Sequence, residues 1–84
     1  MDLEKLEAGL NALTGYDLLA IEQEERLAGN TTLELSTSKS FQARLAARAL
    51  KENVNDLKAL NIKEFNQCCL RVFSFLNAPA QSET

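Results

Sequence analysis

The sequence predicts an all-α fold: a small bundle of three to four helices followed by a disordered C-terminal tail. Apolar residues recur at steps of three and four through most of the 84 residues, the spacing of one helix face. Most of these segments begin at residues that commonly cap helices. Only residues 33–35 alternate as a strand would, and a lone short strand has nothing to pair with. We therefore expect one helical domain over residues 1–77, and a disordered tail over 78–84 in which Pro79 stops helix continuation.

The composition narrows the class of function. Nine basic and twelve acidic residues give a net charge of -3, whereas a general nucleic-acid binder normally carries a basic surplus. No apolar run approaches the roughly 18–20 residues that cross a bilayer. The acidic N-terminal segment also lacks the pattern of a signal peptide. We therefore expect an intracellular protein that does not act in a membrane.

The chain lacks the residue patterns of common catalytic sites. It has no histidine and its three glycines are scattered, which excludes histidine-based dyads and a glycine-rich phosphate loop. Cys68 and Cys69 are adjacent, an arrangement that suits neither a disulfide nor a four-ligand metal site. We interpret both as small core residues, with a redox or metal role as the alternative. The expectation is a protein that is not an enzyme and has no catalytic residues, no metal and no cofactor.

Two helices are expected in the first third of the chain. Residues 2–13 place four leucines on one helical stripe, although Gly9 weakens this helix and an irregular arm is the alternative. A second helix over 14–28 begins at Thr14 with Asp17 in its first turn and ends at Gly29.

The helix over 14–28 has two apolar faces. Tyr16, Leu19, Ala20 and Leu27 share one face, and Leu18, Ile21 and Ala28 share the other. A helix of this kind lies in the middle of its own domain or presents one face to a partner. We take the second face, with Leu18 and Ile21, as the candidate partner-binding face.

A third helix is expected over 40–53, after a polar connection over 29–40 that Leu33 and Leu35 should anchor to the core. Its cap is Ser38 or Ser40, and its alanines let another helix approach closely.

One side of this third helix carries a basic stripe of Arg44, Arg48 and Lys51. Such a stripe is usually a solvated face. It could instead dock an acidic partner, and Glu22, Glu24 and Glu25 in the preceding helix offer that chemistry, within the chain or from another copy. A helix–turn–helix in which the stripe contacts phosphates is the third alternative.

The last helix has the clearest signature. After a short helical segment over 54–60, capped by Asn55, Asn61 and Glu64 show capping-box spacing at the start of a helix over 61–77. Leu70 points into its polar arc and Phe75 lies at the edge of its apolar arc, so both are candidates for partner binding. The predicted core comprises Phe41, Leu45, Phe65, Val72 and Leu76.

Five short motifs between residues 12 and 77 occur in an order that resembles the small tail assembly chaperones of long-tailed bacteriophages. They are LTGYDLLAIEQE from residue 13, SFQARLAARAL from 40, VNDLKAL from 54, IKEFN from 62 and VFSFL from 72. Family members look similar: an LTGxDLL helix start, a loop, an alanine-rich helix with an early aromatic residue, a V-x-x-L turn, and a last helix ending near FL. Many of them begin with a longer, more strand-like segment, whereas this chain begins with a short leucine stripe.

The resemblance implies a non-enzymatic function in the host cell cytoplasm. Such chaperones bind the tape measure protein, keep it soluble and help the tail tube protein to polymerise around it. The residues that could contact such partners are Leu18, Ile21, Arg44, Arg48, Lys51, Leu70 and Phe75. A small helical nucleic-acid-binding regulator that uses the basic stripe, or a structural adaptor subunit, is the alternative, and a homo-oligomer is left open.

Overall fold

A computed structural model of the chain describes residues 1–78, and over these residues the all-α prediction is confirmed. The helices are α1 (Leu3–Ala12), α2 (Gly15–Leu27), α3 (Lys39–Leu50), α4 (Val54–Lys58) and α5 (Ile62–Asn77), with a 3₁₀ turn at Leu35–Thr37. Ala78 ends α5 as its C-cap, and the rest of the predicted disordered tail, residues 79–84, lies outside the described residues. No helix in residues 1–78 is long and apolar enough to cross a membrane.

Polar side chains set where the helices begin. The Asp17 carboxylate accepts a hydrogen bond from the Thr14 backbone N–H (2.9 Å), and Asn61 Oδ1 accepts one from the Glu64 N–H (2.9 Å), as their spacing predicts. The predicted cap of α4 is wrong by two residues. Asn53, rather than Asn55, is the cap, because its Oδ1 accepts from the Asn55 N–H (2.8 Å).

The third helix is shorter than predicted at its C-terminal end. Ser38 caps it, with Oγ accepting from the Phe41 N–H, and Lys51 ends it in a left-handed conformation with φ of 59°. This conformation breaks the helical hydrogen-bond pattern before residue 53.

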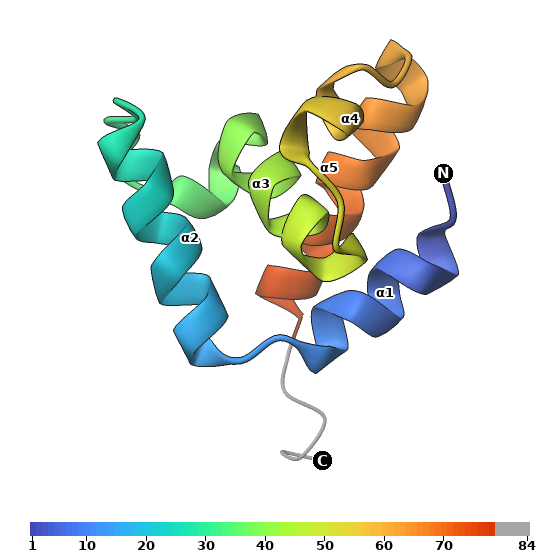
Figure 1. Cartoon of the computed structure of the whole chain (residues 1–84), viewed down its shortest axis with the longest axis horizontal. Helices are drawn as coiled ribbons and strands as arrows, with labels where there is room; N and C mark the ends of the chain where they lie inside the picture. The colour runs from blue at the N-terminus through green and yellow to red at the C-terminus, as the bar shows by residue number, and fades with distance from the viewer. Residues whose placement is uncertain (79–84) are drawn as a thin grey trace.

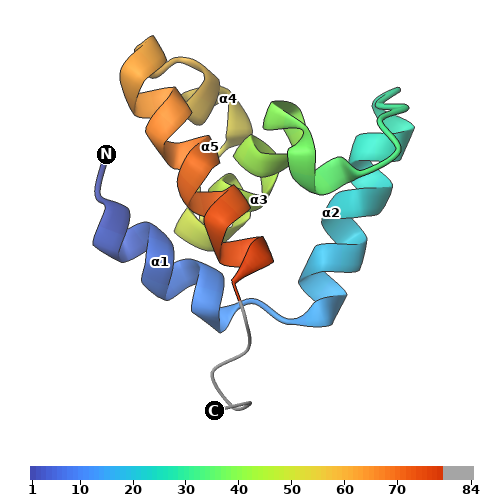
Figure 2. The same cartoon turned by 180° about the vertical axis from the view of Figure 1, so that it is seen from behind.

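α3 lies at the centre of the molecule. Each of the other four helices packs against it, and Figures 1 and 2 show it enclosed between α1, α2, α4 and α5. Ala43, Ala46 and Ala47 of α3 are buried, and their small side chains let the surrounding helices approach closely. α1 approaches α3 closely, because a Cβ on Gly9 would lie 2.2 Å from the Ala49 carbonyl oxygen.

The core agrees with most of the prediction. Phe41, Leu45 and Val72 are fully buried, whereas Phe65 and Leu76 are half-buried. The remaining buried apolar side chains include Leu6, Leu10, Ile21, Leu35, Leu50 and Leu57. Leu35 therefore anchors the connecting loop as expected, but the prediction for Leu33 is wrong, because Leu33 is 98% exposed.

Both cysteines are buried free thiols, as the prediction of core residues requires. Burial raises the pKa of Cys68 to about 11, and burial also raises the pKa of Cys69. At neutral pH both side chains are therefore protonated thiols, which are weak nucleophiles and weak metal ligands.

Candidate protein-binding surface

α2 is attached to the molecule along one side only. Within residues 1–78, α3 is the one helix that it packs against extensively, and it diverges from α1 after the link at Leu13 and Thr14 (Figures 1 and 2). Ile21 (2% exposed) and Glu25 (1% exposed) form the centre of its inner face, with Leu18 half-buried beside them. Ile21 therefore belongs to the chain's own core and offers no surface to a partner, which corrects the choice of the face with Leu18 and Ile21.

Glu25 carries a buried charge and is fully hydrogen-bonded. Its Oε1 accepts from Arg44 Nε (2.8 Å) and Ser40 Oγ (3.0 Å), and its Oε2 accepts from Asn30 Nδ2 (2.7 Å). Burial acts to raise the pKa of Glu25, but the hydrogen bonds from Asn30, Arg44 and Ser40 outweigh it, so this pKa lies below its ordinary value. An ionised, paired Glu25 therefore fixes α2 against α3.

Further ion pairs join α2 to α3, one of them near the start of α2. Asp17 Oδ1 lies 2.9 Å from an Arg48 guanidinium nitrogen, and Glu24 lies 3.5 Å from Arg44 and 3.9 Å from Arg48. The pKa of Asp17 is lowered by the Thr14 backbone N–H and by Arg48.

The predicted basic stripe is thus largely engaged within the chain. Arg44 and Arg48 meet Asp17, Glu24 and Glu25 of α2, so they are not a free docking surface for an acidic partner. Lys51 is exposed at the end of α3 and has no ion-pair partner among residues 1–78. The acidic helix that the sequence offered as a partner for this stripe is indeed its partner, and it belongs to the same chain.

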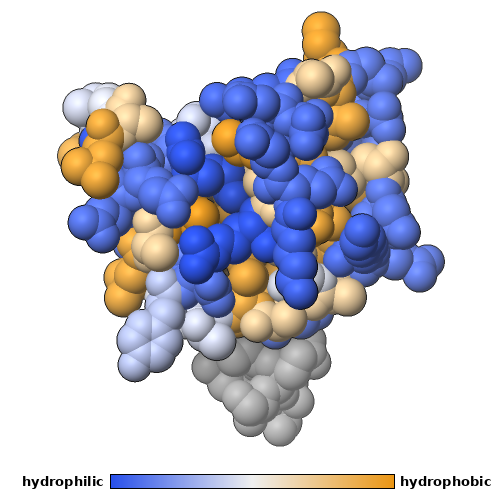
Figure 3. All heavy atoms as spheres, viewed as in Figure 1, coloured by the Kyte–Doolittle hydropathy of each residue, from blue (hydrophilic) through white to orange (hydrophobic). Residues whose placement is uncertain are grey.

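The opposite face of α2 presents large apolar side chains to solvent. Tyr16 is 88% exposed, Leu19 is 64% exposed and Leu27 is 80% exposed. These three residues, here called the outer stripe of α2, fall within an arc of about 80° that lies roughly opposite Glu25. On the α2 side of the surface in Figure 3, hydrophobic side chains reach the solvent at separate points, with hydrophilic side chains between them.

The loop that follows α2 is held to the end of that helix by hydrogen bonds. Arg26 donates to the carbonyl oxygens of Asn30 (3.0 Å) and Thr32 (2.6 Å), which holds the backbone just before Leu33. Leu33 is therefore presented to solvent by hydrogen bonds rather than drawn toward the core. Together with the stripe it extends the exposed apolar surface beyond the end of α2.

The two candidates on α5 differ from each other. Leu70 is 56% exposed, so its predicted position off the core is confirmed. Phe75 is half-buried against the core and lines a hollow with Leu10, Leu13 and Leu18, which leaves little of its ring for a partner. Leu70 and the outer stripe belong to different helices that do not pack extensively against each other, so the candidates do not form one site.

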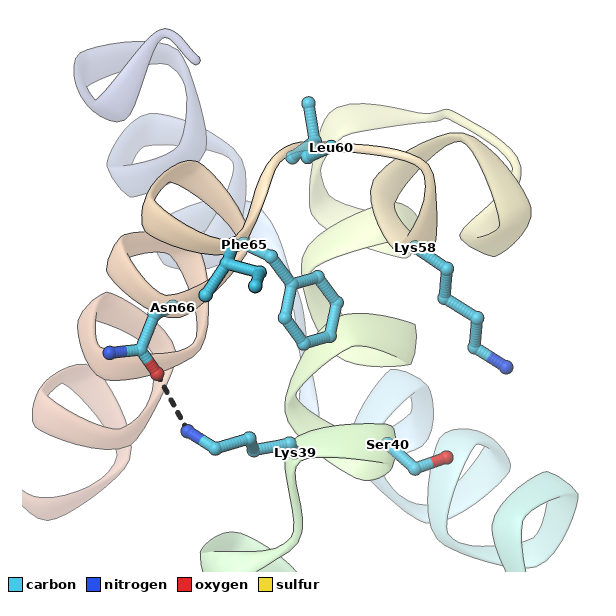
Figure 4. A pocket seen from close by; sticks show the side chains of 7 residues that line it. Lys39, Ser40, Lys58, Leu60, Phe65 and Asn66 are labelled. Atoms are coloured by element: carbon cyan, nitrogen blue, oxygen red, sulfur yellow. Dashed lines mark hydrogen bonds between the residues drawn. The ribbon is translucent and has the colours of Figure 1, made fainter.

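A groove that the sequence did not predict lies where α3, α4 and α5 meet. Lys39, Ser40, Lys58, Leu60, Ile62, Phe65 and Asn66 line a volume of about 470 Å³. These residues come from three helices and the link before α5, so no spacing within one helix could have identified them. Phe65 was assigned to the core, but its half-buried ring lies within this groove (Figure 4).

No protein-family model matches the chain, and no curated protein or solved structure matches it at a significant level. Among residues 1–78, no three histidine, cysteine, aspartate or glutamate side chains gather in a way that could hold a metal ion. The arrangement that the described residues do provide is an exposed apolar helix face on a rigid support, which suits protein binding.

Proposed function

We propose that this chain is a tail assembly chaperone, and that it binds the tape measure protein of a long-tailed bacteriophage through the outer stripe of α2. The observation that carries the proposal is the exposure of Tyr16, Leu19 and Leu27, between 64% and 88%, on a helix fixed from behind by a buried ion pair. Exposed apolar side chains gathered on one face mark interaction sites in soluble proteins.

The motif resemblance supports the identity of the partner. The LTGYDLL motif forms the start of α2, and it supplies both Tyr16 and Leu19 of the outer stripe. The proposed function is not enzymatic, since it requires the chain to make or break no covalent bond.

The proposed contact is one helix against another. The outer stripe would pack on an apolar face of the tape measure protein, which is expected to be helical, and Glu22 at the edge of the stripe would meet a basic residue at the rim. Covering apolar faces in this way keeps a long helix soluble in the host cytoplasm until the tail tube protein polymerises around it.

Co-expression tests this function. Fragments of the tape measure protein, taken from the gene nearest to the gene for this chain, would be expressed alone and together with the chain. The soluble fraction of each fragment would then be measured. We expect the wild-type chain to raise the solubility of at least one fragment and to co-purify with it. The double variant Leu19→Glu/Leu27→Glu should lose both effects, because two carboxylates would face the partner's apolar side chains.

Leu70→Glu is the control, since it places one such carboxylate on an exposed leucine of a different helix. It should retain co-purification. Loss with Leu70→Glu and retention with the α2 double variant would place the binding site on α5 and overturn the assignment to α2. No change in solubility and no co-purification with the wild-type chain would overturn the chaperone function itself.

The nucleic-acid alternative loses its main support, because Arg44 and Arg48 are paired with carboxylates of α2. An adaptor subunit would use the same outer stripe as a chaperone. It differs in outcome, because an adaptor stays in purified mature tails, whereas the proposed chaperone is absent from them.

A further inference from the structure

The groove around Phe65 combines an apolar surface with positive charge. We call it the Phe65 groove and define it by Lys39, Ser40, Lys58, Leu60, Ile62, Phe65 and Asn66. Figure 4 shows the Phe65 ring between Lys39 and Asn66 on one side and Lys58 on the other, with Leu60 above it. Leu60, Ile62 and Phe65 supply its apolar surface, and the two lysines form opposite edges.

The charge of the groove is opposite to that of the whole chain. The chain carries a net charge of -3, but among residues 1–78 no carboxylate lines the groove. Lys39 is held in place by a hydrogen bond from its Nζ to Asn66 Oδ1 (2.7 Å). Ser40 in the first turn of α3 and Ile62 in the first turn of α5 bring the positive ends of two helix dipoles to the same place.

The shape of the groove favours a helix over a small molecule. Ile62 is 87% exposed at the edge of the groove and Phe65 is only half-buried, so the apolar surface continues outward from the hollow. A small molecule inside the hollow would cover only the part of Ile62 that lines it and would leave the rest of that side chain in water. A helix laid across the groove would place an apolar side chain against Phe65 and cover Ile62 with the next turn.

We propose that the Phe65 groove is a second docking site, and that it binds an acidic amphipathic helix of a partner protein. An apolar side chain of that helix packs on Phe65 and Ile62, and carboxylates on either side of it meet Lys39 and Lys58. The site is separate from the outer stripe of α2, since none of its residues lies on that helix. Because the two surfaces lie on different helices, binding at one can be lost without loss of binding at the other.

Two synthetic peptides test this preference. Both form about four turns of helix with the same leucines, one with glutamate and the other with lysine at the flanking positions. Fluorescence anisotropy of each labelled peptide would be measured against the full chain. We expect the acidic peptide to bind at least tenfold more tightly than the basic one, and its binding to weaken as salt is raised.

Variants locate the site. Lys39→Glu and Lys58→Glu should each weaken binding of the acidic peptide about fivefold, since each reverses one charge at the rim. Lys5→Glu is the matched control, because Lys5 is an exposed lysine of α1, outside the groove, and this change should leave affinity unaltered. Amide shifts of residues 39–40 and 58–66 should respond to the acidic peptide, and those of 16–27 should not.

Several results would overturn the proposal. Equal affinity for the two peptides would show that Lys39 and Lys58 do not select an acidic partner. The same would follow if Lys5→Glu weakened binding of the acidic peptide as much as Lys39→Glu and Lys58→Glu do. Saturation of the groove by decanoate without any binding of the acidic peptide would make it a small-molecule site. Concentration-dependent self-association that Lys58→Glu abolishes would make the occupant a second copy of the chain rather than a partner helix.

Discussion

α1 and α2 both pack against α3, but they are held there by different forces. α1 buries Leu6 and Leu10 completely, and its Gly9 brings its backbone against Ala49. α2 buries one large aliphatic side chain, Ile21, beside the ion pair of Glu25 with Arg44. The apolar stripe of α1 is thus used for folding. α2 is fixed largely by charge, and its outer stripe stays in solvent, where we propose that a partner binds.

The first prediction concerns the attachment of α1 to α3. Gly9→Ala should lower the free energy of unfolding by about 3 kcal/mol, because a Cβ there would lie 2.2 Å from a backbone oxygen that cannot easily move. Helix propensity alone predicts the opposite sign, a gain of about 1 kcal/mol. Urea unfolding followed by circular dichroism measures the change.

Gly15→Ala is the control for this prediction, because nothing lies within 4 Å of a Cβ added at Gly15 in the first turn of α2. It should leave stability unchanged or slightly raised. A Gly9→Ala protein as stable as the wild type would contradict the close packing of α1 on α3.

The next effect concerns the attachment of α2. Arg44→Met should cost about 2 kcal/mol of unfolding free energy, because it leaves the Glu25 carboxylate buried without its charged partner. The control is Arg71→Met. Arg71 lies 3.8 Å from Glu7, both side chains are more than 40% exposed, and the loss should be under about 0.5 kcal/mol. Equal losses for the two variants would mean that Glu25 does not hold α2.

Acid should loosen α2 before α1. In the folded state, the pKa values of Glu25 and Asp17 are lowered. The stability that these two carboxylates contribute is therefore fully present above their unfolded pKa of about 4, and it is lost as the pH falls toward their folded pKa values. Amide exchange in α2 should accelerate as pH falls below about 4, after correction for the intrinsic rate, while α1 stays protected. Glu25→Gln should weaken this pH dependence. Uniform loss of protection in both helices would contradict the difference between them.

The smallest effect on stability belongs to the outer stripe. Leu19→Glu and Leu27→Glu should each change the unfolding free energy by less than about 0.5 kcal/mol, because both side chains are mostly in solvent. The same substitution at Leu10 of α1 should prevent folding, since it would bury an unpaired carboxylate. Thermal unfolding separates these outcomes, and a large loss at Leu19 would place that residue in the core.

Local patterns in the sequence predicted much of the fold. Asn61 and Glu64 interact within one turn, so their cap could be identified from spacing alone. The exposed position of Leu70 followed from helical periodicity in the same way. Both features depend on residues that are neighbours in the chain.

The candidate site was harder to predict, because it depends on contacts between helices. The sequence identified two apolar faces on α2 but not which one would be buried. Glu25 lies on the face that carries Ile21, and the arginine that pairs with it lies 19 residues further on. The sequence did hold one indication of the buried face: Glu25 is aligned with Ile21, and the next helix carries a basic stripe that could pair with it. Leu33 and the Phe65 groove had no such signal, since their environments come from hydrogen bonds and helices distant in sequence.

The proposed role of the outer stripe of α2 as a protein-binding surface can be tested by amide-shift mapping. The isotopically labelled chain would be titrated with the tape measure fragment that it keeps soluble. We expect the largest changes in the amide shifts of Tyr16, Leu19 and Leu27 and their neighbours, and no change in those of Leu6 and Leu10 in α1. Changes centred on Leu70 or on α1, or no changes at all, would contradict the claim.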